Sequence, residues 1–147
     1  KFIKMEKRSI NMEKRRYWLF VTNDENWKTI KSKSIYGFND KGKRDLEKLN
    51  INDLVIIYIK GKKIGGIFEI KSLKANSLIK FAEGEYPYKI ELKKVVIPKA
   101  MMELTEKIIN NISIFKGQKR WGTILMGRST KEISKEDYYY IKNILGE

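Results

Sequence analysis

The sequence contains no cysteine and no histidine in 147 residues. Without these side chains the chain can form no disulfide, no usual Cys/His zinc site and no nucleophilic triad that depends on either residue. Any enzyme of this composition would have to work with carboxylates, lysines and tyrosines, or with a hard metal ion. We expect no cofactor. The missing cysteines also fit a reducing compartment, and we expect a cytoplasmic location.

Long apolar runs are absent as well. No run approaches the roughly 18 residues that a membrane-spanning helix needs, and the first residues are charged, so we expect neither a span nor a signal peptide. The hydrophobic content of 41% fits a globular protein. A chain of this length corresponds to one domain with one substantial core.

Acidic residues are few relative to basic ones: 18 Asp and Glu stand against 32 Lys and Arg, a formal net charge of +14. Such a balance favours a polyanionic partner, and a proteome rich in lysine is the alternative explanation. Seven of the basic residues fall within residues 1–16. We therefore expect residues 1–16 to be a basic extension, acting as an arm on a phosphate backbone or simply solvated, and residues 17–147 to be a single domain.

The stretch from Tyr17 to Phe38 organises the rest of the chain. Tyr17–Val21 is aromatic and branched, which predicts a strand. Thr22 or Asn23 can cap a following helix on which Trp27 and Ile30 share a face, and an aromatic-glycine corner is expected at Tyr36–Gly37. Amide side chains beside aromatic rings are what a pocket for a flat, polar heterocycle needs.

Further elements follow from the hydrophobic pattern. Gly65–Gly66 inside a strand predicts a β-bulge or a close backbone approach. The expected elements are a short helix at Gly42–Leu49, strands at Leu54–Ile59 and Ile64–Ile70 around a turn at 61–63, an alternating strand at Tyr86–Val96, a helix at Met101–Ile112, a short strand at Trp121–Met126 and a final helix after Ser134. The fold class predicted is mixed α+β, a small β-barrel of about five or six strands with short flanking helices.

Several short motifs, in this order, resemble the EVE domain, a small β-barrel family of the PUA-like superfamily. They are Tyr17-Trp18, Thr22-Asn23, Asn26-Trp27, Tyr36-Gly37, Gly65 to Glu69, Tyr86 to Tyr88, Trp121-Gly122, Met126 to Arg128 and Glu132-Ile133. The resemblance covers about Tyr17 to Leu145. A more distant similarity is to the YTH domain, which reads N6-methyladenine in RNA.

The resemblance implies a base-binding site. In the YTH-like relatives, residues at the positions of Asn23 and Asn26 contact the base edge, and aromatics at the position of Ile35–Tyr36 and in the loop before a later strand enclose the base. Phe81 or Tyr86 would supply the second ring, although tyrosine and phenylalanine here replace tryptophan. For each aromatic, core packing is the alternative explanation. The predicted base-binding set is Asn23, Asn26, Trp27, Tyr36, Gly37, Phe81, Tyr86 and Trp121.

A basic stretch with no acid between Phe115 and Lys131 is the candidate backbone contact. Gly127–Arg128 resembles the segment of the relatives that touches a phosphate, and a merely solvated basic loop is the alternative. Such contacts position a nucleic acid without reading its sequence. The predicted phosphate-binding set is Lys116, Lys119, Arg120, Arg128 and Lys131.

These features predict a non-catalytic nucleic-acid-binding module that accepts a modified or flipped base. Relatives fused to restriction machinery imply modified DNA as the favoured partner and an associated motor or nuclease subunit; RNA is the alternative. The rival is a Mg²⁺-dependent nuclease in which Asp53, Glu69 and Lys71 follow the PD-(D/E)xK layout. Against that, Asp53 suits an ordinary turn, and Glu69 and Lys71 suit an ordinary wet strand face. A protein-interaction domain is a third alternative.

Overall fold

The computed structural model describes residues 15–39, 42–73, 88–118, 125 and 129–146. Its helices and strands are β1 (Tyr17–Thr22), α2 (Asp24–Lys33), β2 (Ile35–Phe38), α3 (Lys43–Glu47), β3 (Leu54–Ile59), β4 (Lys63–Ser72), β5 (Tyr88–Val96), β6 (Met102–Glu103), α4 (Glu106–Ile109), β7 (Thr130–Ile133) and α5 (Lys135–Leu145). None of these helices is long and apolar enough to cross a membrane.

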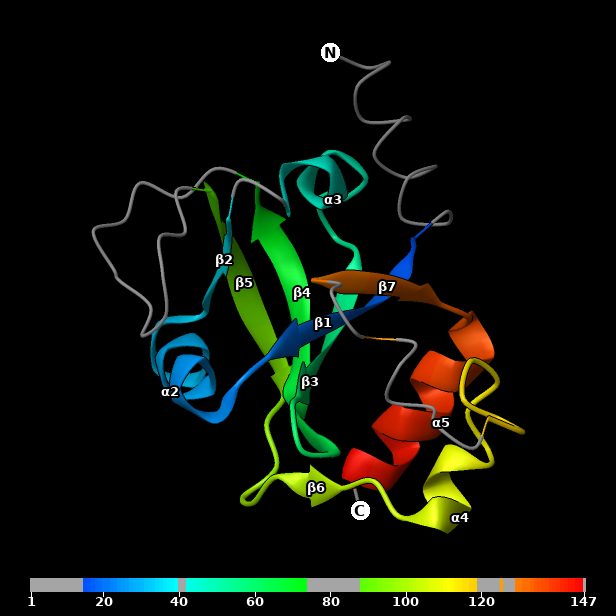
Figure 1. Cartoon of the computed structure of the whole chain (residues 1–147). Coiled ribbons are helices and arrows are strands. Elements are labelled where there is room, and N and C mark those ends of the chain that lie inside the picture. The colour runs from blue at the N-terminus through cyan, green and yellow to red at the C-terminus, as the bar shows by residue number, and fades with distance from the viewer. Residues whose placement is uncertain (1–14, 40–41, 74–87, 119–124, 126–128, 147) are drawn as a thin grey trace.

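The strands form one curled sheet in the order β2-β5-β4-β3-β1-β7, and the short β6 pairs with the start of β4 (Figure 1). β1 and β3 run parallel, and the other pairs are antiparallel. The sheet and its short helices confirm the predicted mixed α+β, barrel-based class.

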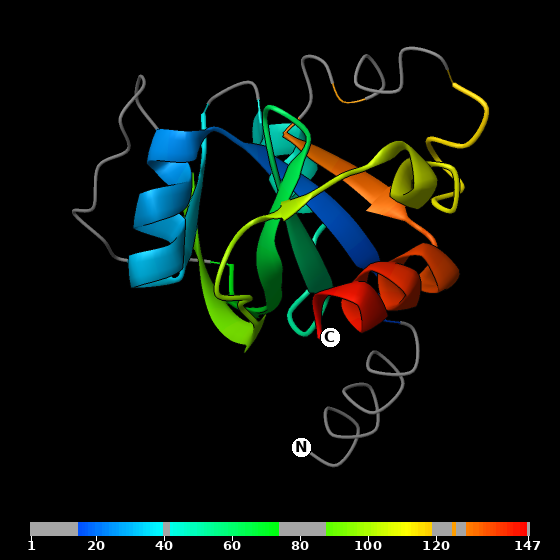
Figure 2. The same cartoon turned by 90° about the horizontal axis from the view of Figure 1, so that it is seen from below.

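Helices cover both faces of the sheet. α2 lies on one side, and α4 and α5 lie on the other (Figures 1 and 2). β3 is therefore buried along its whole length, with Val55 and Ile57 in the α2-side core and Leu54 and Ile56 in the α5-side core. A strand covered on both faces reads as a continuous apolar run, which is the pattern of Leu54–Ile59.

The local signals around α2 and β4 are confirmed. Asn23 is the N-cap of α2, and its side-chain oxygen accepts a hydrogen bond from the Asn26 backbone N–H at 2.8 Å. The register between β3 and β4 shifts opposite Gly65, which is the predicted bulge. A Cβ atom at Gly65 would lie 2.7 Å from Trp27 Cζ2, so glycine lets the α2 tryptophan pack directly on the strand.

The predicted corner at Tyr36–Gly37 is wrong. Both residues lie inside β2, which is buried at all four positions and pairs with β5. The chain reverses earlier, at Ser34, whose φ of 57° ends α2 in the left-handed conformation. A serine in that conformation carries no sequence signal comparable to glycine, which explains the misplacement.

The predicted helix over Met101–Ile112 is also wrong in its first half. Met102 pairs with Ile64 as part of β6, and α4 begins only after Thr105. β7 was not predicted, since it is four residues long and its two middle residues are charged. The strand predicted at Trp121–Met126 lies outside the described residues except for Leu125, which is buried.

Tyr138 of α5 is fully buried, and its hydroxyl has no hydrogen-bond partner among the described residues. Burial, followed by the neighbouring Tyr139, raises the pKa of Tyr138 to about 12 from its ordinary value of 10.0. A folded pKa above the unfolded one gives stability that is complete below pH 10 and is lost as the pH rises towards 12.

We therefore expect the melting temperature of the parent to fall more steeply between pH 10 and 12 than that of Tyr138→Phe. At pH 7 the phenylalanine variant is expected to be as stable as the parent or up to about 1 kcal/mol more stable, because it removes an unsatisfied buried hydroxyl. Thermal melts of the parent and the variant at pH 7 and across pH 10 to 12 measure both effects. A clear loss of stability at pH 7 would mean that the hydroxyl is hydrogen bonded.

Candidate nucleic-acid interface

The start of α2 carries the two predicted base-edge residues. Asn23 is half-buried at the point where β1 ends, and Asn26 is buried one turn further along. Capping uses the side-chain oxygen of Asn23, and its amide nitrogen is of the type that donates two hydrogen bonds. Asn23 therefore combines a helix cap with a donor group just after the carboxyl end of β1.

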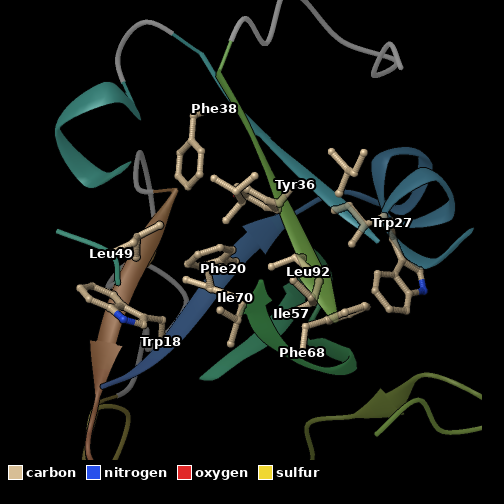
Figure 3. Close-up of a cluster of buried hydrophobic side chains, with 14 of the residues drawn as sticks. Trp18, Phe20, Trp27, Tyr36, Phe38, Leu49, Ile57, Phe68, Ile70 and Leu92 are labelled. Carbon is tan, nitrogen blue, oxygen red and sulfur yellow. The ribbon is translucent and has the colours of Figure 1, made fainter. Parts of the chain in front are cut away.

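Trp27 and Tyr36, two of the predicted ring residues, lie in the core. Each is 5% exposed. The Trp27 ring packs edge-on against Phe68, with centroids 6.1 Å apart, and the Tyr36 ring contacts Phe20 at 4.7 Å and Phe38 at 5.0 Å (Figure 3). Gly37 is buried beside them. A stacking role for Tyr36 remains a prediction, and its packing role is an observation.

The hydroxyl of Tyr36 joins elements that are far apart in the sequence. It donates a hydrogen bond to the Val21 carbonyl at 2.6 Å and lies 3.4 Å from the Ser129 carbonyl. The Val21 N–H in turn donates to the same Ser129 carbonyl at 2.8 Å. Tyr36 thus connects β2, one end of the sheet order, with β1 and the segment that enters β7, the other end.

These contacts bring β2 and the residue before β7 to the end of β1. Ser129 directly follows Arg128, and its partner Val21 stands two residues before Asn23. Asn23, Tyr36 and the residue after Arg128 therefore gather around the carboxyl end of β1. We call this group the β1-end cluster. The predicted site residues Phe81, Tyr86, Trp121, Lys119, Arg120 and Arg128 lie outside the described residues.

The remaining two phosphate-binding candidates, Lys116 and Lys131, lie on different elements. Lys131 is half-buried on β7 and pairs with Leu19, a residue of the α5-side core. Lys116 is exposed in the turn after α4. That turn lies on the α4 side of the sheet, away from α2 (Figures 1 and 2). The structure therefore does not join Lys116 to the start of α2.

The three residues of the nuclease alternative do not form a metal site. Asp53 is 2% exposed, and its carboxylate accepts hydrogen bonds from Trp18 Nε1 at 3.0 Å and from the backbone N–H groups of Arg16 at 3.1 Å and Asn50 at 3.0 Å. Its role is to fasten the start of β1 to the turn before β3. No group of three acidic side chains suited to a metal ion occurs in the described part of the chain.

Glu69 is engaged elsewhere. Its carboxylate pairs with Arg15 Nη2 at 3.0 Å, and its strand partner Leu54 belongs to the α5-side core, whereas Trp18 belongs to the α2-side core. Successive side chains point to opposite faces of a sheet, so Asp53 and Glu69 lie on opposite faces. Lys71 is exposed. The layout that the sequence suggested is therefore not assembled by the fold.

The lysine-rich turn between β3 and β4, at residues 60–63, lies beside α2 and was not predicted as part of the site. The parallel pairing of β1 and β3 brings the Lys60 N–H to the Thr22 carbonyl at 2.8 Å. Lys63 Nζ forms an ion pair with Asp24 Oδ1 at 2.9 Å. The four-residue run Lys-Gly-Lys-Lys was the available signal, but only the strand pairing places it next to Asn23.

Comparison with known proteins identifies a family and several relatives. The family model of the EVE domain matches residues 16–144. Two UPF0310 proteins are 29% identical to the chain, one from Pyrococcus horikoshii over 145 residues and one from Pyrococcus abyssi over 143 residues. Each alignment covers 88% of this chain and at least 98% of the relative.

Solved structures share the fold at low sequence identity. The Pho92 YTH domain in complex with m6A superposes with a TM-score of 0.65 at 17% identity, covering 90% of this chain and 84% of that one. The YTH domain of Zygosaccharomyces rouxii MRB1 in complex with N6-methyladenosine RNA gives 0.65 at 13% identity, covering 90% and 85%. Protein Atu2648 from Agrobacterium tumefaciens gives 0.59 at 20% identity, covering 89% and 93%.

Proposed function

This chain belongs to the EVE domain family, and on that premise we propose that it is a non-catalytic nucleic-acid-binding module that accepts a modified, flipped base. The observation that carries the proposal is the β1-end cluster. There a capping asparagine, a tyrosine joined to two strands and the residue after Arg128 meet at the carboxyl end of β1.

Two further facts support the proposal. The net charge of +14 favours a polyanionic partner, since neutralising phosphates releases counterions. The fold is shared with YTH domains that were solved in complex with m6A and with N6-methyladenosine RNA. N6-methyladenine is therefore the first modified base to test, and 5-methylcytosine is a suitable second probe.

The proposed division of labour follows from the chemistry of each group. The amide of Asn23 hydrogen bonds the edge of the flipped base, and Arg128 and Lys131 hold the neighbouring backbone. Extrusion of a base costs a few kcal/mol, which is least for single-stranded substrates. Stacking on an aromatic ring returns about 1–3 kcal/mol per base. Phe81, Tyr86 and Trp121 remain the predicted rings for that contact.

The proposal extends to the partner and its setting. We propose modified DNA as the natural ligand. The chain would act in the cytoplasm as the DNA-recognition domain of a restriction system, together with a motor or nuclease subunit. Parallel titrations with DNA and RNA strands of one sequence separate this from RNA recognition. Tighter binding of the RNA strand would contradict the DNA assignment and leave the reader function intact.

Asn23→Ser is the variant that tests the site. Serine is as good an N-cap as asparagine, so the variant is expected to melt within about 1 °C of the parent, whereas it lacks the amide donor. Its preference for a strand with one N6-methyladenine or 5-methylcytosine over the plain strand is expected to fall by about 1–3 kcal/mol. Fluorescence anisotropy measures both affinities.

Arg128→Ala is the matched comparison. It is expected to weaken both strands equally and to lower the slope of log K against log salt by about one, as a phosphate contact requires. An Asn23→Ser variant that is folded and discriminates as well as the parent would contradict the site assignment.

A further inference from the structure

The β3–β4 hairpin presents lysines on a constrained turn. Residues 60–62 connect Ile59 to its partner Lys63, and Gly61 and Lys62 have φ values of 104° and 66°. Two consecutive residues in the left-handed region define a tight reversal that glycine favours at its first position. Lys60 and Lys62 are both exposed.

Contacts on both sides hold this turn in place. The Lys60 N–H donates to the Thr22 carbonyl at 2.8 Å, and Lys63 Nζ pairs with Asp24 at 2.9 Å. On the other side, the Leu104 N–H donates to the Lys62 carbonyl at 2.8 Å. Thr22 and Asp24 are the two neighbours of Asn23. The hairpin is therefore fastened to both sides of the residue that we assign to the base edge.

The turn carries three lysines. Lys63 Nζ pairs with Asp24, and Lys60 and Lys62 are exposed at the tip of the turn. Paired strands lie about 4.8 Å apart, so the backbone of Lys60 is one strand spacing from the end of β1. A lysine side chain spans that distance, and its ammonium binds phosphate as a point charge.

We propose that Lys60 and Lys62 contact the backbone phosphates of the nucleotide next to the base held at Asn23. This inference rests on the proposed function and adds an anchoring point to the one proposed at Arg128. The hairpin follows β3, the neighbour of β1 on the side away from β7. A nucleic-acid backbone held at the hairpin passes the carboxyl end of β1, and the flipped base then reaches Asn23.

The test compares two variants of equal charge loss. Lys60→Ala/Lys62→Gly removes the basic tip, with glycine at position 62 because it accepts the positive φ. Lys93→Ala/Lys94→Ala removes two adjacent exposed lysines from β5. Both lower the net charge by two, so a general effect of charge is the same in each. Thermal melts confirm that each variant is folded.

The probes are nine-nucleotide single strands with and without one N6-methyladenine or 5-methylcytosine, titrated at several salt concentrations. The hairpin variant is expected to bind every strand about tenfold more weakly, with the salt slope reduced by about 1.4, the value for two phosphates of a single strand, and with the modified-to-plain ratio unchanged. The β5 variant is expected to lose much less affinity and slope.

Three outcomes separate the two proposals. If the parent discriminates between strands but the two variants behave alike, the hairpin assignment is wrong and the reader function stands. A hairpin variant that loses discrimination rather than affinity also overturns the phosphate assignment. If the parent binds none of the strands, the proposed function fails and the hairpin inference fails with it.

Discussion

Replacing Tyr36 with alanine is expected to lower the free energy of unfolding by about 3–5 kcal/mol. The ring is 5% exposed and packs between Phe20 and Phe38, and its hydroxyl donates to the Val21 carbonyl at 2.6 Å. Truncation leaves a cavity and an unpaired carbonyl at the point where β2 meets β1. Urea denaturation followed by circular dichroism measures the loss.

Tyr36→Phe is the matched variant, because it keeps the ring and removes only the hydroxyl. We expect it to lose about 0.5–1.5 kcal/mol of stability, the value of a typical hydrogen bond. If the ring also stacks on a base, this variant retains the preference for the modified strand. An alanine variant as stable as the parent would contradict the core assignment and favour a role of Tyr36 in stacking on the base.

The second large effect is expected at Asp53, where alanine should cost about 3–5 kcal/mol of stability. The carboxylate accepts hydrogen bonds from Trp18, Arg16 and Asn50, so its removal leaves three donors around a buried space without their acceptor. Asp53→Asn keeps one acceptor oxygen and places an amide against a donor, so an intermediate loss is expected. Denaturation of both variants gives the ranking.

A cleavage assay tests the nuclease alternative, in which Asp53 and Glu69 would be catalytic. We expect no cleavage of plasmid or RNA by the parent with Mg²⁺ or Mn²⁺. Cleavage that disappears in Glu69→Ala would contradict the non-catalytic account. Glu69 is a suitable test position because it lies on the opposite face of the sheet from Asp53 and forms a half-buried ion pair with Arg15. Melts of Glu69→Ala would exclude unfolding as the cause.

The parts of the fold that were predictable are those with local signals. Asn23 marks the start of α2 because its side chain caps that helix. Leu54–Ile59 was recognisable as a strand because five of its six residues are aliphatic, and all six are buried. Ser134 accepts a hydrogen bond from the Asp137 N–H at 3.1 Å, as a cap should. Each of these depends on residues within one or two turns of the chain.

The parts that were missed depend on pairing between distant residues. Nothing in the sequence says that β1 lies parallel to β3, and that pairing alone places Lys60 beside Thr22. Ser34 adopts its left-handed conformation within the chain reversal between α2 and β2. Asp53 reads as a turn residue, and its three hydrogen bonds appear only when β1 and the turn before β3 meet.

The candidate site divides in the same way. The position of Asn23 and Asn26 at the start of α2 was predictable because a helix start is a local feature, whereas their contact with a base stays a prediction. The sequence could not decide whether the Tyr36 ring is buried in the core or encloses a base, since the same aromatic pattern is compatible with both. The contact between its hydroxyl and the strand ends joins residues 21, 36 and 129. No spacing rule connects those three positions.

The measurement that tests the central claim most directly is a titration of the parent chain with strands that differ only by one methyl group on a base. A methyl group adds no charge, so the account predicts that both affinities fall as salt rises while their ratio stays constant and favours the modified strand. Equal affinities that fall together with salt, for N6-methyladenine and 5-methylcytosine in DNA and in RNA alike, would reduce the function to polyanion binding and contradict the claim.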